Sequence, residues 1–310
     1  MIGYIARRIL VAIPTLLVII TLAFFMMRFA PGGPFDLERP MPEQTRQNLL
    51  ASYGMDQPVA KQYLDYLVDL AQFDLGPSLK FRDKSVSQII AEGFPVSATV
   101  GLLSMGLAVF IGTILGSIAA LRQNTAVDYG VVGFATVGIV IPPFVVGPIL
   151  ALVIGIYLGW LPSGGLDPRH GMTVERMILP VITLALPQIA IISRLMRASM
   201  IEVIRSNFIR TARAKGLSPF AVISRHALRA AILPLVSYLG PATAALLTGS
   251  IVIEQVFSLP GVGRQFVFAA LQRDYTVVMG VVILYAGLII ALNLVADLLY
   301  AVLNPKVKFD

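Results

Sequence analysis

The sequence contains no cysteine and few charged residues. Without cysteine, neither a disulfide framework nor a thiolate metal site can form. Only 13% of the 310 residues are charged and 57% are hydrophobic, whereas a typical soluble protein has about 25% charged residues. Composition therefore predicts a membrane protein. The net charge of +7 is better explained by basic loops on the cytoplasmic side of a membrane than by nucleic-acid binding.

Sequence motifs of common enzymes are also missing. The phosphate-binding pattern GxxxxGK[ST] does not occur, so we do not expect this chain to hydrolyse ATP. HExxH, GxSxG and paired carboxylates on an apolar run are absent as well. The two histidines, His170 and His226, fall on opposite sides of the membrane in the topology derived below. The sequence therefore predicts no catalytic residue and no metal site.

What the sequence does have is long apolar runs, which predict an all-α polytopic membrane protein. We expect six transmembrane helices, at 9–27, 96–121, 131–158, 177–192, 233–257 and 276–299. Gly112 and Gly116 in the second run form a GxxxG pair, which permits close packing of helices. Pro142 and Pro143 interrupt the third run, and they mark either backbone that lines a cavity or a packing kink.

The chain divides into three parts on this basis. Residues 1–29 form an N-terminus and an uncleaved first helix, 30–95 a polar insert, and 96–310 a core of five transmembrane helices. Within the insert, 42–53 and 58–73 are expected to be helical. The second of these has an apolar stripe that reads either as local core or as a peptide-binding face: Val59, Tyr63, Tyr66, Leu67 and Leu70.

Charge distribution predicts the orientation. Thirteen Lys or Arg and four acidic residues fall in segments 1–8, 122–130, 194–232 and 297–310, whereas the rest of the chain carries 11 and 13. Because short cytoplasmic loops are enriched in Lys and Arg, we expect both termini and the 194–232 loop in the cytoplasm, and the insert outside.

The loop 194–232 is the most informative stretch, with eight Lys or Arg and one acid. One such charge at the middle of a bilayer costs about 2.5–3.5 kcal/mol and one Leu returns only about 0.3–0.6 kcal/mol, so we expect this loop to lie in water or at a surface. We expect a helix over 196–215, a break at Gly216, and a second helix with Ser218 as N-cap and Pro219 at its first position. In the second helix an apolar face is expected from Phe220, Ile223, Ala227 and Ala231.

A helix–Gly–helix loop that ends in proline resembles the EAA loop of permease subunits of ABC importers. Arg210, Thr211 and Ala212 stand where Glu-Ala-Ala is common, Gly216 matches the glycine, and Pro234 comes five residues later than usual. These departures are typical of the dipeptide/oligopeptide branch. The stretches FFMMRFAPGGPF, NFIRTARAKGL, LPGVG…RDY and DLLYAVLNPKVKF resemble the same branch, so the resemblance runs nearly end to end.

The resemblance implies a type I ABC importer permease in the bacterial inner membrane, with a small extracytoplasmic domain between its first two helices. It implies an oligopeptide importer with a second homologous permease, two ATP-binding subunits and an extracytoplasmic peptide-binding protein as partners. ATP and Mg would then be bound by partner subunits, with no cofactor in this chain, which would contact membrane lipid and no nucleic acid. Dipeptides, glutathione or nickel remain alternative cargoes. A self-contained secondary transporter is the alternative from another class.

Position in the motif singles out a candidate ATPase-docking surface: Asn207, Phe208, Thr211, Ala212, Ala214, Gly216, Leu217 and Pro219. The alternative is that the loop only fixes the topology through its charges, which leaves the Gly-Leu-Ser-Pro break unexplained. Glu254, near the end of the fifth run, is a candidate for an external gate. The simpler interpretation, which we favour at this point, is an interfacial glutamate bonded to water.

Overall fold

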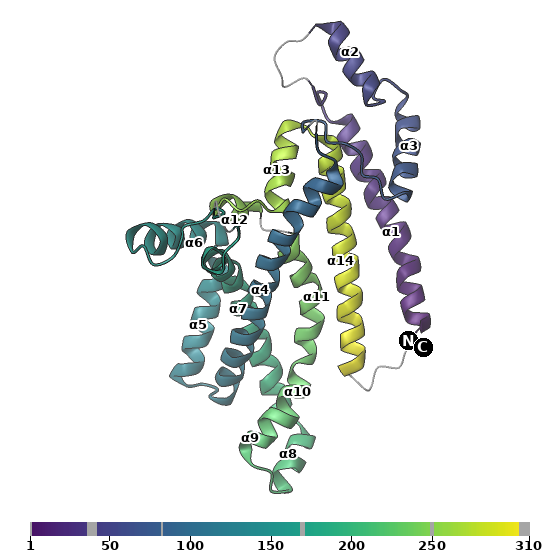
Figure 1. Ribbon diagram of the computed structural model, residues 1–310. Helices are drawn as coiled ribbons and strands as arrows, with labels where there is room; N and C mark the ends of the chain where they lie inside the picture. Colours follow the sequence, from purple (N-terminus) through teal and green to yellow (C-terminus); the bar gives the residue numbers. More distant parts are fainter. Residues whose placement is uncertain (1, 36–41, 82, 168–170, 249–250, 304–310) are drawn as a thin grey trace.

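The structure is a computed structural model that describes residues 2–35, 42–81, 83–167, 171–248 and 251–303 (Figure 1). These parts are helical and contain no β-strand. His170 and residues 304–310, on which part of the sequence analysis rests, lie outside them.

The first helix and the insert supply α1 (Ile2–Phe29), α2 (Glu43–Ser52) and α3 (Val59–Ala71). The core begins with α4 (Val86–Leu121), α5 (Ala126–Val140), α6 (Pro143–Leu150), the π-helical segment η1 (Ala151–Tyr157) and α7 (Val174–Ile204). The loop contains α8 (Asn207–Ala214), α9 (Pro219–Ala221), the π-helical segment η2 (Val222–Ala227) and α10 (Leu228–Ala231). The chain ends with α11 (Leu233–Leu247), α12 (Ile251–Val256), α13 (Val262–Gln272) and α14 (Tyr275–Leu303).

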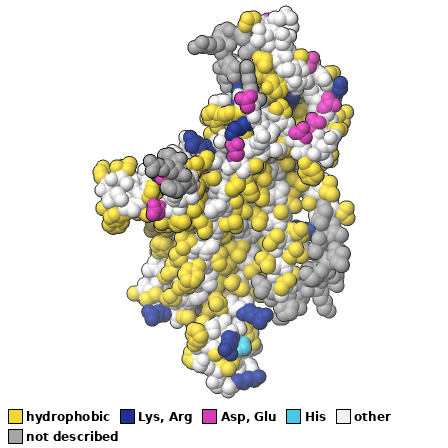
Figure 2. Space-filling model, viewed as in Figure 1, with side chains coloured by type: hydrophobic (Ala, Val, Ile, Leu, Met, Phe, Trp, Pro, Cys, Tyr) yellow, Lys and Arg dark blue, Asp and Glu magenta, His cyan; other side chains and the backbone are white. Residues whose placement is uncertain are grey.

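The helices form an elongated bundle with distinct ends (Figure 1). We call the end that carries α8 to α10 the loop end, and the opposite end, which carries α2, α3 and α13, the insert end. Figure 2 shows a hydrophobic middle. In this view acidic side chains, with some Lys and Arg, gather towards the insert end, whereas the charged side chains at the loop end are Lys and Arg. This polarity agrees with the charge pattern of the sequence.

Five segments of the described chain are long and apolar enough to cross a membrane, namely 10–29, 86–121, 174–204, 233–256 and 275–302. A sixth span exists if α5 and the α6–η1 segment are taken as one broken helix, because they are long and apolar enough to cross a membrane only as a pair. The chain bends by 97° between them, at Pro142-Pro143. Proline supplies no backbone N–H to continue the helix, so the break that the sequence predicts there is confirmed.

The tightest packing in the bundle joins α4 to α7. A Cβ atom added to Gly112 would come within 2.8 Å of the Ile192 side chain, and one added to Gly116 would collide with the Ser193 carbonyl oxygen. The GxxxG pair therefore works as the sequence predicts, by letting two backbones approach closely. Met196 and Met200 of α7 are fully buried in the same core.

The insert packs on the first helix. The hydroxyl groups of Tyr63 on α3 and Thr21 on α1 lie 2.6 Å apart, and the Tyr63 ring lies 5.3 Å from the Phe24 ring. The whole predicted stripe of α3 contacts the α1 cluster around Ile20 and Phe24. Of the two interpretations left open, the structure therefore supports local core.

Two helices of the core extend well beyond the predicted spans. The helix of the second span begins at Val86 and runs through Pro95. Ser85 starts it with a capping box, in which the Ser85 hydroxyl accepts from the Gln88 N–H at 3.2 Å. The fourth span is likewise part of a longer helix, because α7 continues to Ile204 without a break.

Candidate functional site

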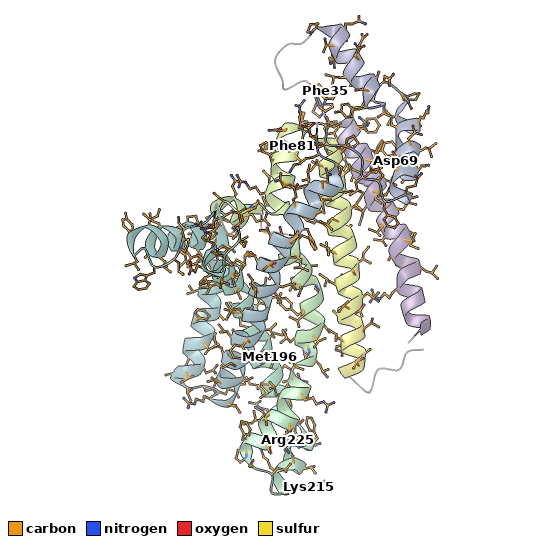
Figure 3. All side chains as sticks on the ribbon, in the orientation of Figure 1. Phe35, Asp69, Phe81, Met196, Lys215 and Arg225 are labelled. Atoms are coloured by element: carbon orange, nitrogen blue, oxygen red, sulfur yellow. The ribbon has the colours of Figure 1, made fainter. Side chains whose placement is uncertain are left out.

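The candidate site is the loop at the loop end of the bundle, where Figure 3 labels Lys215 and Arg225. Its turn is at Gly216, which has a φ of +78° and open space where a Cβ atom would lie. The Leu217 N–H donates to the Ala212 carbonyl oxygen at 3.4 Å across the turn. Glycine is favoured here by backbone conformation rather than by crowding.

The second helix of the loop starts as the sequence predicts. The Ser218 hydroxyl accepts from the Ala221 N–H at 3.3 Å, and Pro219 occupies the first turn. The serine thus satisfies one of the N–H groups that a helix leaves without a partner at its start, and proline has none to satisfy there. The helix–Gly–helix form of the loop is confirmed.

The prediction of one helix over 196–215 is wrong. α7 ends at Ile204, Arg205 and Ser206 form a break, and α8 begins at Asn207. The Ser206 hydroxyl donates to the Val203 carbonyl oxygen at 2.6 Å. Such a local bond from a serine side chain competes with helix continuation. The sequence has no glycine or proline at 205–206 to indicate the break.

The inner side of the loop joins it to the bundle. Ile209, Ala227 and Ala231 are fully buried and belong to the core cluster that includes Met196. The expectation that Phe220 shares this buried face is wrong, because its side chain is 80% exposed and Val222 is buried instead. The segment from Val222 is π-helical, and its i→i+5 spacing changes which side chains share a face.

Most of the proposed docking residues are exposed. They are Asn207, Phe208, Thr211, Ala214, Gly216, Leu217 and Pro219. Phe208 and Leu217 are large apolar side chains with 48% and 40% of their surface exposed. Ala212 differs from the rest, because it is only 6% exposed and packs in the interior of the loop.

The sequence did not predict a buried ion pair that lies at the base of the loop. Asp128, at the start of α5, is 1% exposed and binds Arg197 of α7 through two contacts, Nε to Oδ1 at 2.5 Å and Nη2 to Oδ2 at 2.7 Å. The Asn124 N–H donates to the same carboxylate at 2.9 Å. Nearby, Arg205 donates to the Gln123 side chain at 2.9 Å. The α4–α5 turn is thereby attached to the helix that leads into the loop.

Glu254, the other candidate, lies at the insert end and is 5% exposed. Its carboxylate accepts from the Ser97 hydroxyl of α4 at 2.6 Å and from the Arg264 N–H in the first turn of α13 at 2.8 Å. The Ser97 oxygen in turn accepts from the Val262 N–H at 2.9 Å. Only glycine fits at Gly261, because a Cβ there would collide with the carboxylate. Glu254 therefore connects α4, α12 and α13 through protein partners rather than water.

The described residues contain no cluster of three or more His, Cys, Asp or Glu that could hold a metal ion. The arrangement instead offers a protruding loop attached to α7 at one end, and a buried carboxylate that ties three helices together at the other. Neither is a set of reacting groups.

Two family models cover almost the whole sequence. The one described as "Binding-protein-dependent transport system inner membrane component" matches residues 112–309. Its N-terminal companion model matches residues 1–101. This chain belongs to the binding-protein-dependent permease family. The members of this family are membrane subunits of ABC importers, so the predicted type I permease fold and the assignment to this class are confirmed.

Curated relatives are similar over the full length of the permease. It is 48% identical over 309 residues to the oligopeptide transport system permease protein OppB of Haemophilus influenzae, with 100% of each chain covered. It is 42% identical over 306 residues to the dipeptide transport system permease protein DppB of Bacillus subtilis, with 98% of this chain and 97% of the relative covered.

A solved structure supports the fold independently. The MetNI methionine ABC transporter, in an inward-facing conformation, contains a chain that matches with a TM-score of 0.59 at 17% identity. The match covers 70% of this chain and 97% of the other. At this identity the likeness concerns the fold alone.

Proposed function

We propose that this permease forms half of the translocation pathway of an ATP-driven oligopeptide importer. The observation that carries the proposal is the loop of residues 194–232. It is a protruding helix–Gly–helix element whose inner side packs onto the transmembrane core, in a chain that is 48% identical to an oligopeptide permease over its full length. Dipeptide import is the nearest alternative, because one relative at 42% identity is named for it.

The topology we propose places the loop end in the cytoplasm of a bacterium and the insert end outside the inner membrane. The basic loop and the segment 1–8, which carries two arginines, lie on the same side in this arrangement, in agreement with the distribution of Lys and Arg in membrane proteins. Both termini are then cytoplasmic. Near them, Arg8 of α1 and Asp297 of α14 form a salt bridge at 2.5 Å.

In the proposed mechanism, the exposed side of the loop docks onto an ATP-binding subunit. Phe208 and Leu217 would supply apolar contact, and the surrounding Lys and Arg side chains would supply charge. Closure of two ATP-binding subunits would displace the loop, and its buried inner side would transmit that displacement to α7. From α7 the displacement reaches α4 through the Gly112–Gly116 contact and α5 through the Asp128–Arg197 pair.

The proposed assembly contains a second homologous permease, two ATP-binding subunits that bind ATP and Mg, and an extracytoplasmic peptide-binding protein. Because this sequence lacks a phosphate-binding loop, ATP hydrolysis by separate subunits is supported. At the insert end, we propose that Glu254 controls the external gate by holding α4, α12 and α13 in one arrangement. Opening there would have to break its hydrogen bonds or move the three helices together.

Reconstitution tests this function against the secondary-transporter alternative. The permease alone in liposomes should give no peptide flux, with or without a proton gradient. Uptake of a tripeptide or longer peptide should appear when the second permease, the ATPase subunits and the peptide-binding protein are added and ATP is enclosed in the liposomes. Flux through the single chain without ATPase subunits would contradict the proposal.

A further inference from the structure

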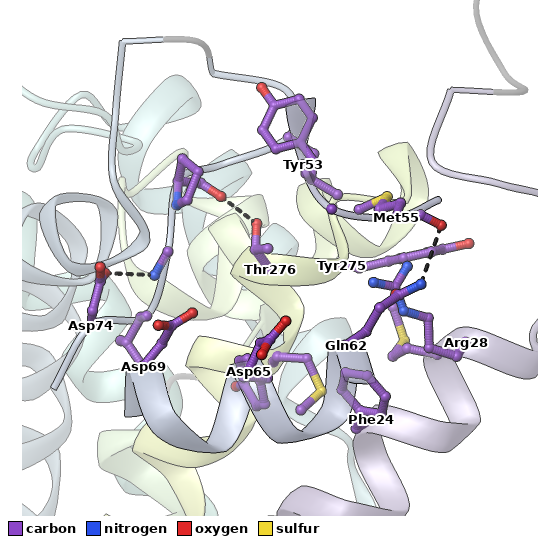
Figure 4. Close-up of a pocket in the computed structure, with 18 of the residues that line it drawn as sticks. Phe24, Arg28, Tyr53, Met55, Gln62, Asp65, Asp69, Asp74, Tyr275 and Thr276 are labelled. Atoms are coloured by element: carbon purple, nitrogen blue, oxygen red, sulfur yellow. Dashed lines mark hydrogen bonds between the residues drawn. The ribbon is translucent and has the colours of Figure 1, made fainter. Parts of the chain in front are cut away.

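A cavity of about 300 Å³ lies at the insert end, between the last turns of α1, helix α3 and the start of α14 (Figure 4). Phe24, Met27, Leu75 and Met279 give it an apolar floor. Its charged groups are Arg28 on α1, Asp65 and Asp69 on α3, and Asp74 after α3, so positive and negative charge line the same space. The proposed transport cycle does not use this cavity.

Arg28 is the cation of the cavity. It is half-buried, it lies over the Phe24 ring at 5.6 Å, and no salt bridge joins it to a carboxylate in the described part of the chain. A charge withdrawn from water is normally paired, because desolvation without a partner is costly. A guanidinium in this position is suited to a phosphate or carboxylate group of a ligand.

Two of the three carboxylates lie on α3, and the third, Asp74, accepts from the Gly76 N–H at 2.9 Å. Asp65 and Asp69 lie one turn apart on the cavity side of α3, where Figure 4 shows them along the helix with Arg28 at the other side of the view. Two buried polar atoms of cavity-lining residues, the Tyr66 hydroxyl and Gln62 Oε1, have no hydrogen-bond partner in the described chain. Burial raises the pKa of the Tyr66 hydroxyl, so it remains a hydrogen-bond donor at neutral pH.

Helix α3 also packs beside the apolar span of α1. Its Tyr63 contacts Thr21, which is inside the apolar span 10–29 and eight residues before its end. On the side that faces away from α1, Leu64 and Val68 are 61% and 56% exposed. Asp65 and Asp69, which directly follow these two residues in the sequence, are also exposed and line the cavity. The exposed side of α3 therefore carries an apolar strip next to an acidic strip. This is the arrangement of a helix at a lipid surface.

We propose that the cavity binds the headgroup of a phospholipid from the leaflet at the insert end, specifically a headgroup with a primary ammonium next to its phosphate. The phosphate binds Arg28, the ammonium donates to Asp65 and Asp69, and the acyl chains lie along Leu64 and Val68. Phosphatidylethanolamine has both groups. Phosphatidylglycerol lacks the ammonium and is repelled by the carboxylates, and phosphatidylcholine has no N–H to donate. The inference rests on the proposed topology, in which the insert end lies at the outer surface of the membrane, and does not depend on which peptide is transported.

The test measures lipid retained by the full-length permease in detergent. The protein is incubated with mixed micelles of equal amounts of the three phospholipids, and bound lipid is counted by native mass spectrometry. We expect one phosphatidylethanolamine per chain. Loss of one charge-assisted hydrogen bond weakens binding about tenfold, so Arg28→Gln, and Asp65→Asn combined with Asp69→Asn, should each reduce retention about tenfold.

Matched controls are available on the same insert. Asp56→Asn and Lys61→Gln change exposed charges outside the cavity and should leave retention unchanged. Arg28→Lys keeps the charge and should retain more lipid than Arg28→Gln, which separates lost binding from lost folding. Equal retention of the three lipids, or equal losses in cavity and control variants, would overturn the proposal. Displacement of the lipid by millimolar tri-alanine would also overturn it, in favour of a peptide site.

Discussion

The Asp128–Arg197 pair gives the most specific prediction, because its two partners differ in burial. The Asp128 side chain is 1% exposed and the Arg197 side chain is 27% exposed. Removing one partner of a buried pair costs about 3–5 kcal/mol, since the other charge is left without compensation. Arg197→Gln leaves the deeply buried carboxylate with only the Asn124 N–H, so we expect a loss of about 3–5 kcal/mol in the free energy of unfolding.

Asp128→Asn should cost less. The arginine that remains is partly in water and can be hydrated, so we expect a loss at or below about 3 kcal/mol, the low end of the range for buried pairs. The double variant, Asp128→Asn with Arg197→Gln, removes both charges and leaves two groups that can share a hydrogen bond. It should be more stable than Arg197→Gln alone, with a coupling energy of about 1–3 kcal/mol.

The assay is reversible unfolding of the purified permease in detergent, followed by circular dichroism for all four proteins of the cycle. The second assay measures the number of ATP molecules hydrolysed per peptide transported by the reconstituted importer. This ratio should rise in the single variants if the pair transmits loop movement to α5. If the two single variants are equally stable, or if the double variant is as unstable as the sum of the singles, the reasoning from burial is refuted.

Three further outcomes are expected. Gly216→Val should uncouple ATP hydrolysis from uptake, because a β-branched residue at positive φ is strained by roughly 1–2 kcal/mol or more. Gly216→Asn should retain coupling, and equal uptake by the two variants would argue against a required turn. Gly116→Ala should lower the melting temperature by forcing α4 from α7, at about 1–3 kcal/mol, while Gly106→Ala on the same helix, where a Cβ meets open space, should not. Glu254→Gln should cost about 1.5–3 kcal/mol and slow uptake, and unaltered uptake would remove it as a gate residue.

Features set by neighbouring residues could be predicted from the sequence. The membrane class, the apolar spans and the Gly216–Ser218–Pro219 turn depend on local composition and on the conformations that glycine and proline favour. The GxxxG contact was also predictable in kind, although its partner, α7, was not. These signals sufficed for the permease fold and the loop.

Features that depend on distant partners were missed. Asp128 and Arg197 lie 69 positions apart, and an isolated aspartate in a short polar turn does not reveal its partner. The burial of Glu254 depends on Ser97, 157 positions away, so the sequence favoured contact with water. The early start of α4 was missed because Pro95 resembles a helix boundary, yet the capping box at Ser85 was present in the sequence as a Ser-x-x-Gln pattern.

The central claim is that the loop of residues 194–232 contacts an ATP-binding subunit inside the cell, and a single thiol tests it most directly. Because the sequence has no cysteine, Leu217→Cys introduces a unique reactive site on the exposed side of the loop, and Lys61→Cys does the same at the insert end. Leu217→Cys should resist a membrane-impermeant maleimide in intact cells and form a cross-link to the ATPase with a short bifunctional reagent, whereas Lys61→Cys should label from outside. Labelling of Leu217→Cys from outside, or cross-linking of Lys61→Cys to the ATPase instead, would contradict the account.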